Sequence, residues 1–114
     1  MNGNKVSFDD LYLKQIDFQK HITNLINLPT DIPQWYSYHM LALISEIGEV
    51  LKADKRWKTH RNSRYIPDEK LEEIADTFIT MLNICIFSNI DLEILLNAIN
   101  RKMDENFKRL NEPI

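Results

Sequence analysis

Residues 67–87 constrain the fold most, because apolar side chains cover this stretch on nearly every side. Pro67 and Asp68 offer a helix start, and apolar positions recur with helical spacing as far as Phe87. A single polar stripe interrupts them at Glu69, Glu73, Asp76, Thr80 and Asn83. A helix with so little polar surface is expected to be buried, and one chain of 114 residues can hardly enclose it. We therefore predict a homodimer or homotetramer with a shared bundle core.

Three other stretches show helical apolar spacing, each beginning near a capping residue: 8 to about 27 after Ser7, about 33 to 56 after Asp31, and 92 to 110 after Asp91. Only two glycines and four prolines are present, which leaves little material for hairpin turns. The sequence therefore predicts an all-α fold, a four-helix bundle in a single domain over residues 1–114.

Composition excludes several classes of protein. A net charge of -3 gives the whole surface no general attraction for nucleic acid or an anionic membrane. The single cysteine, Cys85, allows neither a disulfide framework nor a thiolate metal site. No basic-then-apolar leader begins the chain, and no apolar run reaches the roughly 18 residues that a membrane helix needs. We expect a cytoplasmic protein with neither a membrane nor nucleic acid as partner.

Two glutamates, Glu46 and Glu49, interrupt a run that otherwise reads as a buried helix, "LISEIGEVLKADKRWK". On a helical wheel both lie at one edge of the apolar arc, beside the small residues Ala42 and Ala53. Lys52 offers Glu49 a partner three residues on, but nothing within the helix offers one to Glu46.

Glu73 and Asp76 repeat this arrangement on the polar stripe of residues 67–87, with threonines instead of bases four residues on. Carboxylates near a core are costly unless they are paired or bind a metal. An all-oxygen set favours Mg²⁺, with Mn²⁺ as a substitute, over zinc. The histidines are too scattered for a zinc cluster: His21, His39 and His60.

Positive charge is concentrated in one segment, since six of the fourteen basic residues fall between Lys52 and Arg64, together with Trp57. Such a segment could hold a polyphosphate while the ring stacks on a base, and an ordinary solvated loop is an equally open interpretation. On the last helix, three residues share a strip from which all could reach one anion: Lys102, Asn106 and Arg109. For Arg109, complementing the helix dipole is the alternative.

Taken together, these residues resemble the all-α nucleoside triphosphate pyrophosphohydrolases, which include MazG-like proteins, dimeric dUTPases and dCTP pyrophosphatases. The resemblance runs from about Trp35 to Leu110 and rests on "LALISEIGEVLKADKRWK", "LEEIADTFITML" and "NIDLEILLNAINRKMDENFKRL". These segments supply an ExxE helix, an ExxD helix and a closing KxxxN segment in the family's order. "RWK" and "KMDEN" look most like dCTP pyrophosphatases, whereas "LALISEIGEV" is equally close to dimeric dUTPases. Typical MazG sequences carry a glutamate where this chain has Ser45.

The resemblance implies a MazG-like bundle that hydrolyses a nucleoside triphosphate to the monophosphate and pyrophosphate, in nucleotide pool cleansing. dCTP, dUTP or a modified nucleotide would be the substrate. It implies Mg²⁺ ligands at Glu46, Glu49, Glu73 and Asp76, and phosphate contacts from Lys102 and Asn106, with Arg109 a weaker candidate. Trp57 and the adjacent Lys58 would bind the substrate, with Trp57 near the base. Glu46 and Glu49 are the catalytic candidates, and Glu49 is the candidate general base.

Two other function classes remain open at this stage. One is a non-catalytic helical module for nucleotide sensing or protein interaction, in which the acids bind a metal and the basic segment senses a nucleotide. The other is a small nucleic-acid binder that uses "KRWKTHRNSR", although this leaves the acidic strips unexplained and repulsive to phosphate.

Overall fold

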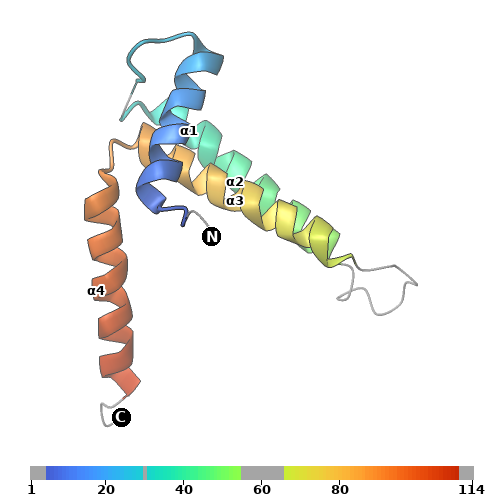
Figure 1. The fold of residues 1–114 in the computed structure, drawn as a ribbon, viewed down its shortest axis with the longest axis vertical. Coiled ribbons are helices and arrows are strands. Elements are labelled where there is room, and N and C mark those ends of the chain that lie inside the picture. Colours follow the sequence, from blue (N-terminus) through green and yellow to red (C-terminus); the bar gives the residue numbers. More distant parts are fainter. Residues whose placement is uncertain (1–4, 30, 55–65, 111–114) are drawn as a thin grey trace.

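The computed structural model describes residues 5–29, 31–54 and 66–110, which form four helices and no strand (Figure 1). The helices are α1 (Phe8–Thr23), α2 (Pro33–Ala53), α3 (Pro67–Phe87) and α4 (Leu92–Leu110). The predicted all-α fold with four helices is confirmed.

Local sequence explains where most of the helices begin. The Ser7 side chain caps α1 by accepting a hydrogen bond from the backbone N–H of Asp10 at 3.1 Å. The Asp91 carboxylate accepts one from the backbone N–H of Glu93 at 2.8 Å, at the start of α4. Both α2 and α3 begin with a proline, whose fixed φ angle suits the first helical position. The caps predicted at Ser7 and Asp91 are confirmed.

Two helix ends differ from the predictions. α1 stops at Thr23, short of the predicted Asn27, because Asn24 takes a left-handed conformation with φ of 58° and closes the helix. α2 stops at Ala53, short of the predicted Arg56, because the backbone of Asp54 is extended.

The cap predicted at Asp31 is wrong. Ile32 is the N-cap of α2, and no side chain caps this helix. Asp31 has a left-handed φ of 57°, and its backbone N–H donates to the carbonyl oxygen of Phe87 at 2.8 Å. The residue therefore ties the entry of α2 to the end of α3.

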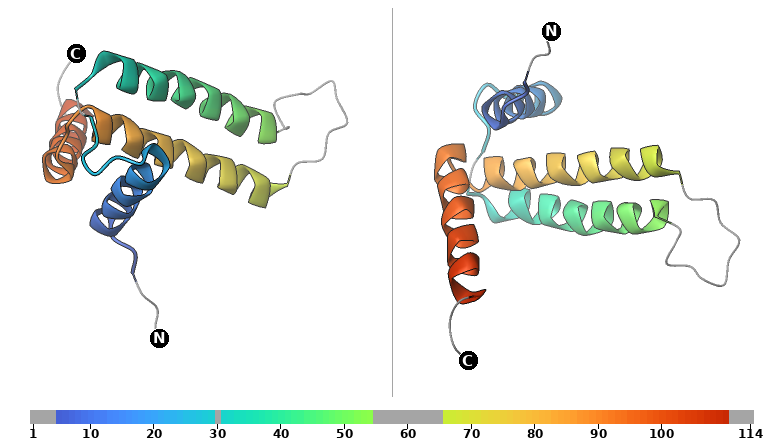
Figure 2. Two further views of the ribbon diagram at one scale, coloured as in Figure 1. Left: turned by 90° about the horizontal axis from the view of Figure 1, so that it is seen from above. Right: turned by 60° about the horizontal axis from the view of Figure 1, so that its bottom comes forward.

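The helices α2 and α3 lie side by side and antiparallel, and α1 packs across α3 (Figures 1 and 2). An ion pair of 2.7 Å between Lys70 and Asp54 joins the last residues of α2 to the first turn of α3. We call the half of the α2–α3 pair that contains this ion pair, residues 40–54 and 66–79, the arm. Beyond the other end of the pair, α4 projects away, after a bend of 117° from α3.

No described helix is by itself long and apolar enough to cross a membrane, although the bent pair of α3 and α4 reaches that length and apolar content together.

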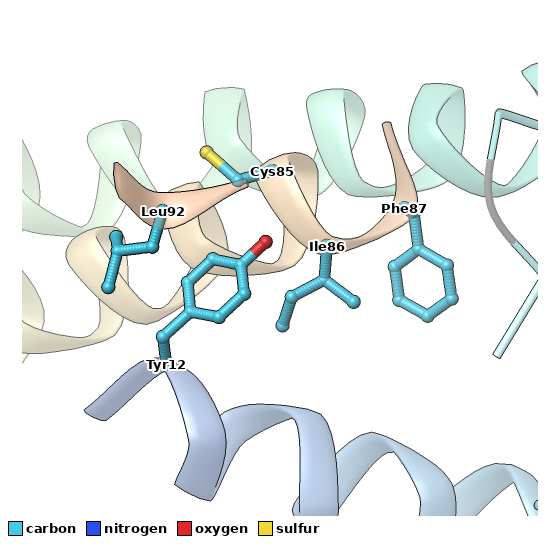
Figure 3. Close-up of a cluster of buried hydrophobic side chains, with 5 residues drawn as sticks. All are labelled: Tyr12, Cys85, Ile86, Phe87 and Leu92. Carbon is cyan, nitrogen blue, oxygen red and sulfur yellow. The ribbon is translucent and has the colours of Figure 1, made fainter. Parts of the chain in front are cut away.

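A small core fills the end of the molecule where α1, α3 and α4 meet (Figure 3). Its buried apolar members are Tyr12, Cys85, Ile86, Phe87 and Leu92. Phe87 has no exposed surface, and its ring stacks on Trp35 and His39 with centroid distances of 5.2 and 4.7 Å. The Tyr12 hydroxyl donates a 2.6 Å hydrogen bond to the carbonyl oxygen of Ile90. Burial, followed by the charges of Cys85 and Asp91, raises the pKa of Tyr12 to about 12. We call this region the packed end.

Among the residues that the structure describes, the arm has no comparable core within one chain. The sequence predicts that the apolar arc of α2 is buried, but four of its members are 50–67% exposed: Met40, Ile44, Ile47 and Leu51. On α3, Leu71 and Phe78 are exposed as well. The radius of gyration is 17.8 Å, against about 13 Å expected for a compact chain of this length. Within one chain the arc is exposed because no described helix covers this face of α2, and the predicted core shared between chains stays a prediction.

Candidate metal centre

Three carboxylates from α2 and α3 converge on one point of the arm. Ligand atoms of Glu46, Glu73 and Asp76 all lie within 4.8 Å of one another. Residues three apart share a helix face, so the pair on α3 points the same way, and the neighbouring α2 brings Glu46 to it. Glu46 and Glu73 are half-buried, whereas Asp76 is exposed. The structure thus brings together three of the four predicted ligands.

The fourth predicted ligand, Glu49, lies one turn along α2 and is not part of this triad. It lines a small hollow of about 250 Å³ together with Lys52, Ala53, Glu69, Glu72 and Glu73. Since Glu73 belongs to both groups, Glu49 borders the triad. Acidic side chains thus gather around Glu73 on this part of the arm, with Lys52 beside them.

Electrostatic repulsion is concentrated at Glu73. Partial burial raises the pKa of this carboxyl, and the negative charges of Asp76, Glu49, Glu46 and Glu72 raise it further. Within the described parts of the chain, no lysine or arginine forms an ion pair with any of the four predicted ligands. Hydroxyls of Thr77 and Thr80 donate to backbone carbonyls, of Glu73 at 2.9 Å and Asp76 at 3.0 Å, and not to the carboxylates. A set of oxygen-only, negatively charged donors fits Mg²⁺ or Mn²⁺ chemically.

The predicted phosphate contacts on α4 do not reach this centre within one chain. The second half of α4 stands away from the arm (Figures 1 and 2). Lys102 Nζ lies 3.6 Å from the carboxylate of Glu105. Asn106 and Arg109 are both exposed. The predicted base-contacting residues Trp57 and Lys58 lie outside the described residues.

A second cavity of about 520 Å³ lies further along the same helices, toward the packed end. Its walls carry aromatic rings and polar groups: Trp35, Tyr38, His39, Gln19, Thr80 and Asn83. On α3, Thr80 and Asn83 follow Asp76 by one and two turns, and on α2, Ala42 in the cavity wall precedes Glu46 by one turn. The cavity and the triad are therefore two parts of one continuous face.

An amide cluster holds the polar wall of this cavity. Side-chain Nε2 atoms of Gln15 and Gln19 both donate to Asn83 Oδ1, at 2.8 and 3.1 Å. These two bonds leave the Nδ2 donor of Asn83 and the Oε1 acceptor of Gln19 without a partner among the described residues. Gln19 and Asn83 are only 4% and 9% exposed. Buried amides seldom keep unused hydrogen-bonding atoms, so this wall is suited to a polar ligand.

His39 adds a neutral ring to the same cavity. It is buried, and burial lowers its pKa, so the imidazole is uncharged near neutral pH. Its ring stacks on Phe87 and meets the Tyr38 ring edge-on at 5.1 Å.

Sequence reasoning missed the amide cluster as a unit. Gln15 stands at a position of the apolar stripe of the first helix, with Gln19 four residues on, and Asn83 ends the polar stripe of the most apolar helix. Amide side chains at core-facing positions are the sequence signal for such a cluster, because polar side chains that face a core need hydrogen-bond partners.

Comparisons of the chain with protein-family models, curated proteins and solved structures found no match. The resemblance to nucleoside triphosphate pyrophosphohydrolases therefore remains a hypothesis based on three segments of sequence.

Proposed function

We propose that the protein is a Mg²⁺-dependent nucleoside triphosphate pyrophosphohydrolase, which cleaves its substrate to the nucleoside monophosphate and pyrophosphate. One observation carries the proposal: carboxylates of Glu46, Glu73 and Asp76 from two helices lie within 4.8 Å of one another, without a described cationic partner. The ExxE, ExxD and KxxxN segments support the same reading. The proposed fold is a MazG-like bundle completed by oligomerisation, which would cover the exposed apolar face of the arm.

The proposal divides the four acids into two roles. Glu46, Glu73 and Asp76 would hold Mg²⁺, which when bound would neutralise phosphate charge and lower the pKa of a coordinated water. Glu49 borders this triad without joining it, so its carboxylate is free to accept a proton from the attacking water.

The aromatic cavity is the proposed site of the nucleobase. Stacking on aromatic rings accepts any base, and a donor beside an acceptor matches the edge of a base. Asn83 Nδ2 and Gln19 Oε1 supply that pair, and His39 adds an uncharged ring. Seven residues separate Asn83 from Asp76, about 10 Å along α3. A nucleotide lying along this face would thus place its base in the cavity and its phosphates at the triad.

The proposal is tested by pyrophosphate release from a panel of canonical and modified nucleoside triphosphates with Mg²⁺, Mn²⁺ or EDTA. We expect metal-dependent release from at least one nucleotide, and its loss in Glu46→Gln. Glu93→Gln, which neutralises an exposed acid on α4, is the matched control and should keep full activity. A folded wild-type protein that releases pyrophosphate from none of them would overturn the proposal.

The base site has its own test once a substrate is known. Gln19→Leu keeps the approximate volume but removes the free acceptor, so we expect KM to rise by about tenfold or more, the value of one lost hydrogen bond to a buried group. The kcat should change much less, because the triad is untouched. An unchanged KM for every base would place the nucleobase elsewhere.

A non-catalytic metal- and nucleotide-binding module is the second candidate. It is favoured by the direction of α4, whose second half, which contains the predicted phosphate contacts, stands away from the arm within one chain (Figure 2). A nucleotide that binds in the presence of Mg²⁺ and remains intact would select this alternative.

A further inference from the structure

His39 is buried in the wall of the aromatic cavity without a hydrogen bond of its own. Only 7% of its surface is exposed, and neither ring nitrogen has a hydrogen-bond partner among the residues that the structure describes. His21, by contrast, is exposed on α1, yet its Nδ1 lies at hydrogen-bond distance, 2.8 Å, from the carbonyl oxygen of Asp17. Buried polar groups are nearly always hydrogen-bonded, so two unused nitrogens on a buried ring indicate a partner that the described chain does not supply.

Packing holds the His39 ring in place before any ligand binds. The ring stacks on the fully buried Phe87, with centroids 4.7 Å apart and planes inclined by 12°, and it meets the Tyr38 ring edge-on. The cavity beside it has a volume of about 520 Å³, within the range of about 300–1,000 Å³ that is common for small-molecule sites. A side chain fixed in this way loses little entropy when it forms a hydrogen bond to a ligand.

The cavity suits an uncharged, planar ligand group. None of the described residues that line it is an aspartate, glutamate, lysine or arginine. Burial lowers the pKa of His39, so the neutral ring carries one N–H donor and one acceptor nitrogen near neutral pH. Nucleobases have the matching chemistry, because they are flat, uncharged and edged with donors and acceptors.

The amide cluster cannot by itself choose among the bases. Asn83 Oδ1 is occupied by Gln15 and Gln19, which leaves Asn83 Nδ2 as a donor and Gln19 Oε1 as an acceptor. The pairing edge of every canonical base carries an acceptor beside a donor: N3 and the amino group in cytosine, O4 and N3–H in uracil and thymine, N1 and the amino group in adenine, and O6 and N1–H in guanine. One donor and one acceptor therefore fit all of them, and selection requires a third polar group.

We infer that His39 is a specificity-determining residue of the nucleotide site, which forms a hydrogen bond with the nucleobase and thereby decides which base the cavity retains. This role rests on the proposed function, which places the base in this cavity, and it goes beyond the stacking that any aromatic ring supplies. A site built to hydrogen-bond one ligand strongly disfavours an analogue that leaves its buried polar groups unpaired. A base that offers His39 no partner would be rejected for this reason.

Calorimetric titration with non-hydrolysable nucleotides tests the inference. The probes are the α,β-imidotriphosphates of deoxycytidine, deoxyuridine, thymidine, deoxyadenosine and deoxyguanosine, with Mg²⁺. We expect the wild type to bind one base more tightly than the others. His39→Phe keeps a ring to stack on Phe87 but removes both nitrogens, so it should weaken binding of the preferred analogue by at least about tenfold and reduce the difference between bases. His21→Phe, at an exposed position on α1, is the matched control and should keep both affinity and preference.

Nuclear magnetic resonance of the wild type gives a readout that a purely structural histidine would not move. In ¹⁵N spectra of the imidazole rings, saturation with the preferred analogue should shift the ring nitrogens of His39, because one of them gains a hydrogen bond. The signals of His21 should stay in place. This measurement needs no substitution at position 39, so it decides the question even if His39→Phe does not fold.

The outcomes separate His39 recognition from the proposed reaction. If triphosphates are hydrolysed but folded His39→Phe keeps wild-type affinity for every base, or the His39 nitrogens do not shift, the inference is overturned and the proposed reaction stands. If no triphosphate is hydrolysed but analogue binding depends on His39, the proposed reaction fails and the inference stands. A folded wild type that binds none of the analogues overturns the inference.

Discussion

The packed end and the arm share the helices α2 and α3, but α1 and α4 contribute only to the packed end, and the two regions differ in burial and in charge. At the packed end, α3 finishes in Cys85, Ile86 and Phe87, all buried against α1, α2 and α4. In the arm, α3 carries Glu73 and Asp76 on one side and the exposed Phe78 on another. One helix thus passes from a solvated acidic surface to a closed core within 21 residues.

This difference indicates that apolar burial is concentrated at the packed end and negative charge in the arm. Apolar burial and stacking around Phe87 hold α1, α2 and α3 together, whereas the triad adds repulsion that the fold must tolerate. A ligand that binds only the folded protein adds to its stability, so a cation bound at the triad would offset this repulsion. The comparison predicts that changes at the two ends will have opposite effects on stability.

The largest expected effect is at the packed end. Phe87→Ala removes a fully buried ring and its stacking on Trp35 and His39, so we expect a loss of about 3–5 kcal/mol in the free energy of unfolding. Phe18→Ala, at a half-exposed position on α1, is the matched control and should cost less than about 1 kcal/mol. Urea denaturation followed by circular dichroism measures both, and equal losses would contradict a core concentrated at Phe87.

In the arm, removing charge should stabilise the protein without metal. Asp76→Asn relieves repulsion with Glu73, so its melting temperature in EDTA should exceed that of the wild type. With Mg²⁺ at about 100 times its dissociation constant, the wild type should gain about 2.7 kcal/mol, and the variant should gain little. Thermal melts with and without Mg²⁺ measure this crossover. Parallel responses of the two proteins would show that Asp76 takes no part in a metal site.

A smaller loss is expected for the link between α1 and the α3–α4 connection. Tyr12→Phe deletes the 2.6 Å hydrogen bond to the carbonyl oxygen of Ile90 but keeps the ring, so we expect a loss of about 1 kcal/mol in the free energy of unfolding. Tyr38→Phe is the control, because Tyr38 is largely exposed, and it should leave the free energy of unfolding nearly unchanged. Denaturant titration of both variants measures the difference.

The stability of the two regions should depend on pH in opposite directions. Burial and the neighbouring carboxylates raise the pKa of Glu73, which favours its protonated form in the folded state. In metal-free protein this contribution stabilises below the unfolded pKa and is lost as pH rises through the folded pKa. Because Mg²⁺ needs the carboxylate, its affinity should fall with decreasing pH, by at most about tenfold per pH unit for one proton.

At the packed end, His39 should make stability change with pH in the opposite direction. Burial lowers its pKa, so its contribution to stability is present above the unfolded pKa of about 6.5 and is lost as pH falls through the folded pKa. Urea denaturation of metal-free wild type and His39→Gln across the acid range isolates the contribution of His39 to stability. A stability profile of the same shape in both proteins would contradict it.

Local signals in the sequence predicted the features that depend on neighbours along one helix. Ser7 and Asp91 cap helices because a cap needs only nearby backbone N–H groups, and the acid pairs share a face because residues three apart always do on a helix. Asp31 is not the cap because Ile32 occupies the N-cap position of α2, and Asp31, one residue earlier, donates its backbone N–H to Phe87, a residue remote in sequence.

Features that depend on packing could not be predicted in the same way. The bonds from Gln15 and Gln19 to Asn83 join α1 to α3 across more than 60 residues of chain. The direction of α4 is set by the bend between α3 and α4, which no single residue predicts. The apolar arc of α2 was predicted to be buried, but periodicity cannot say whether the covering surface belongs to the same chain.

The most direct test of the proposed metal centre is titration of Mn²⁺ into the metal-free protein, with the free ion followed by electron paramagnetic resonance. We expect saturable binding, competed by Mg²⁺ and abolished in the Glu46→Gln, Asp76→Asn double variant, while Glu93→Gln binds normally. Wild-type protein that is folded and leaves all the Mn²⁺ free at millimolar concentration would contradict the claim that the converging carboxylates form a metal centre.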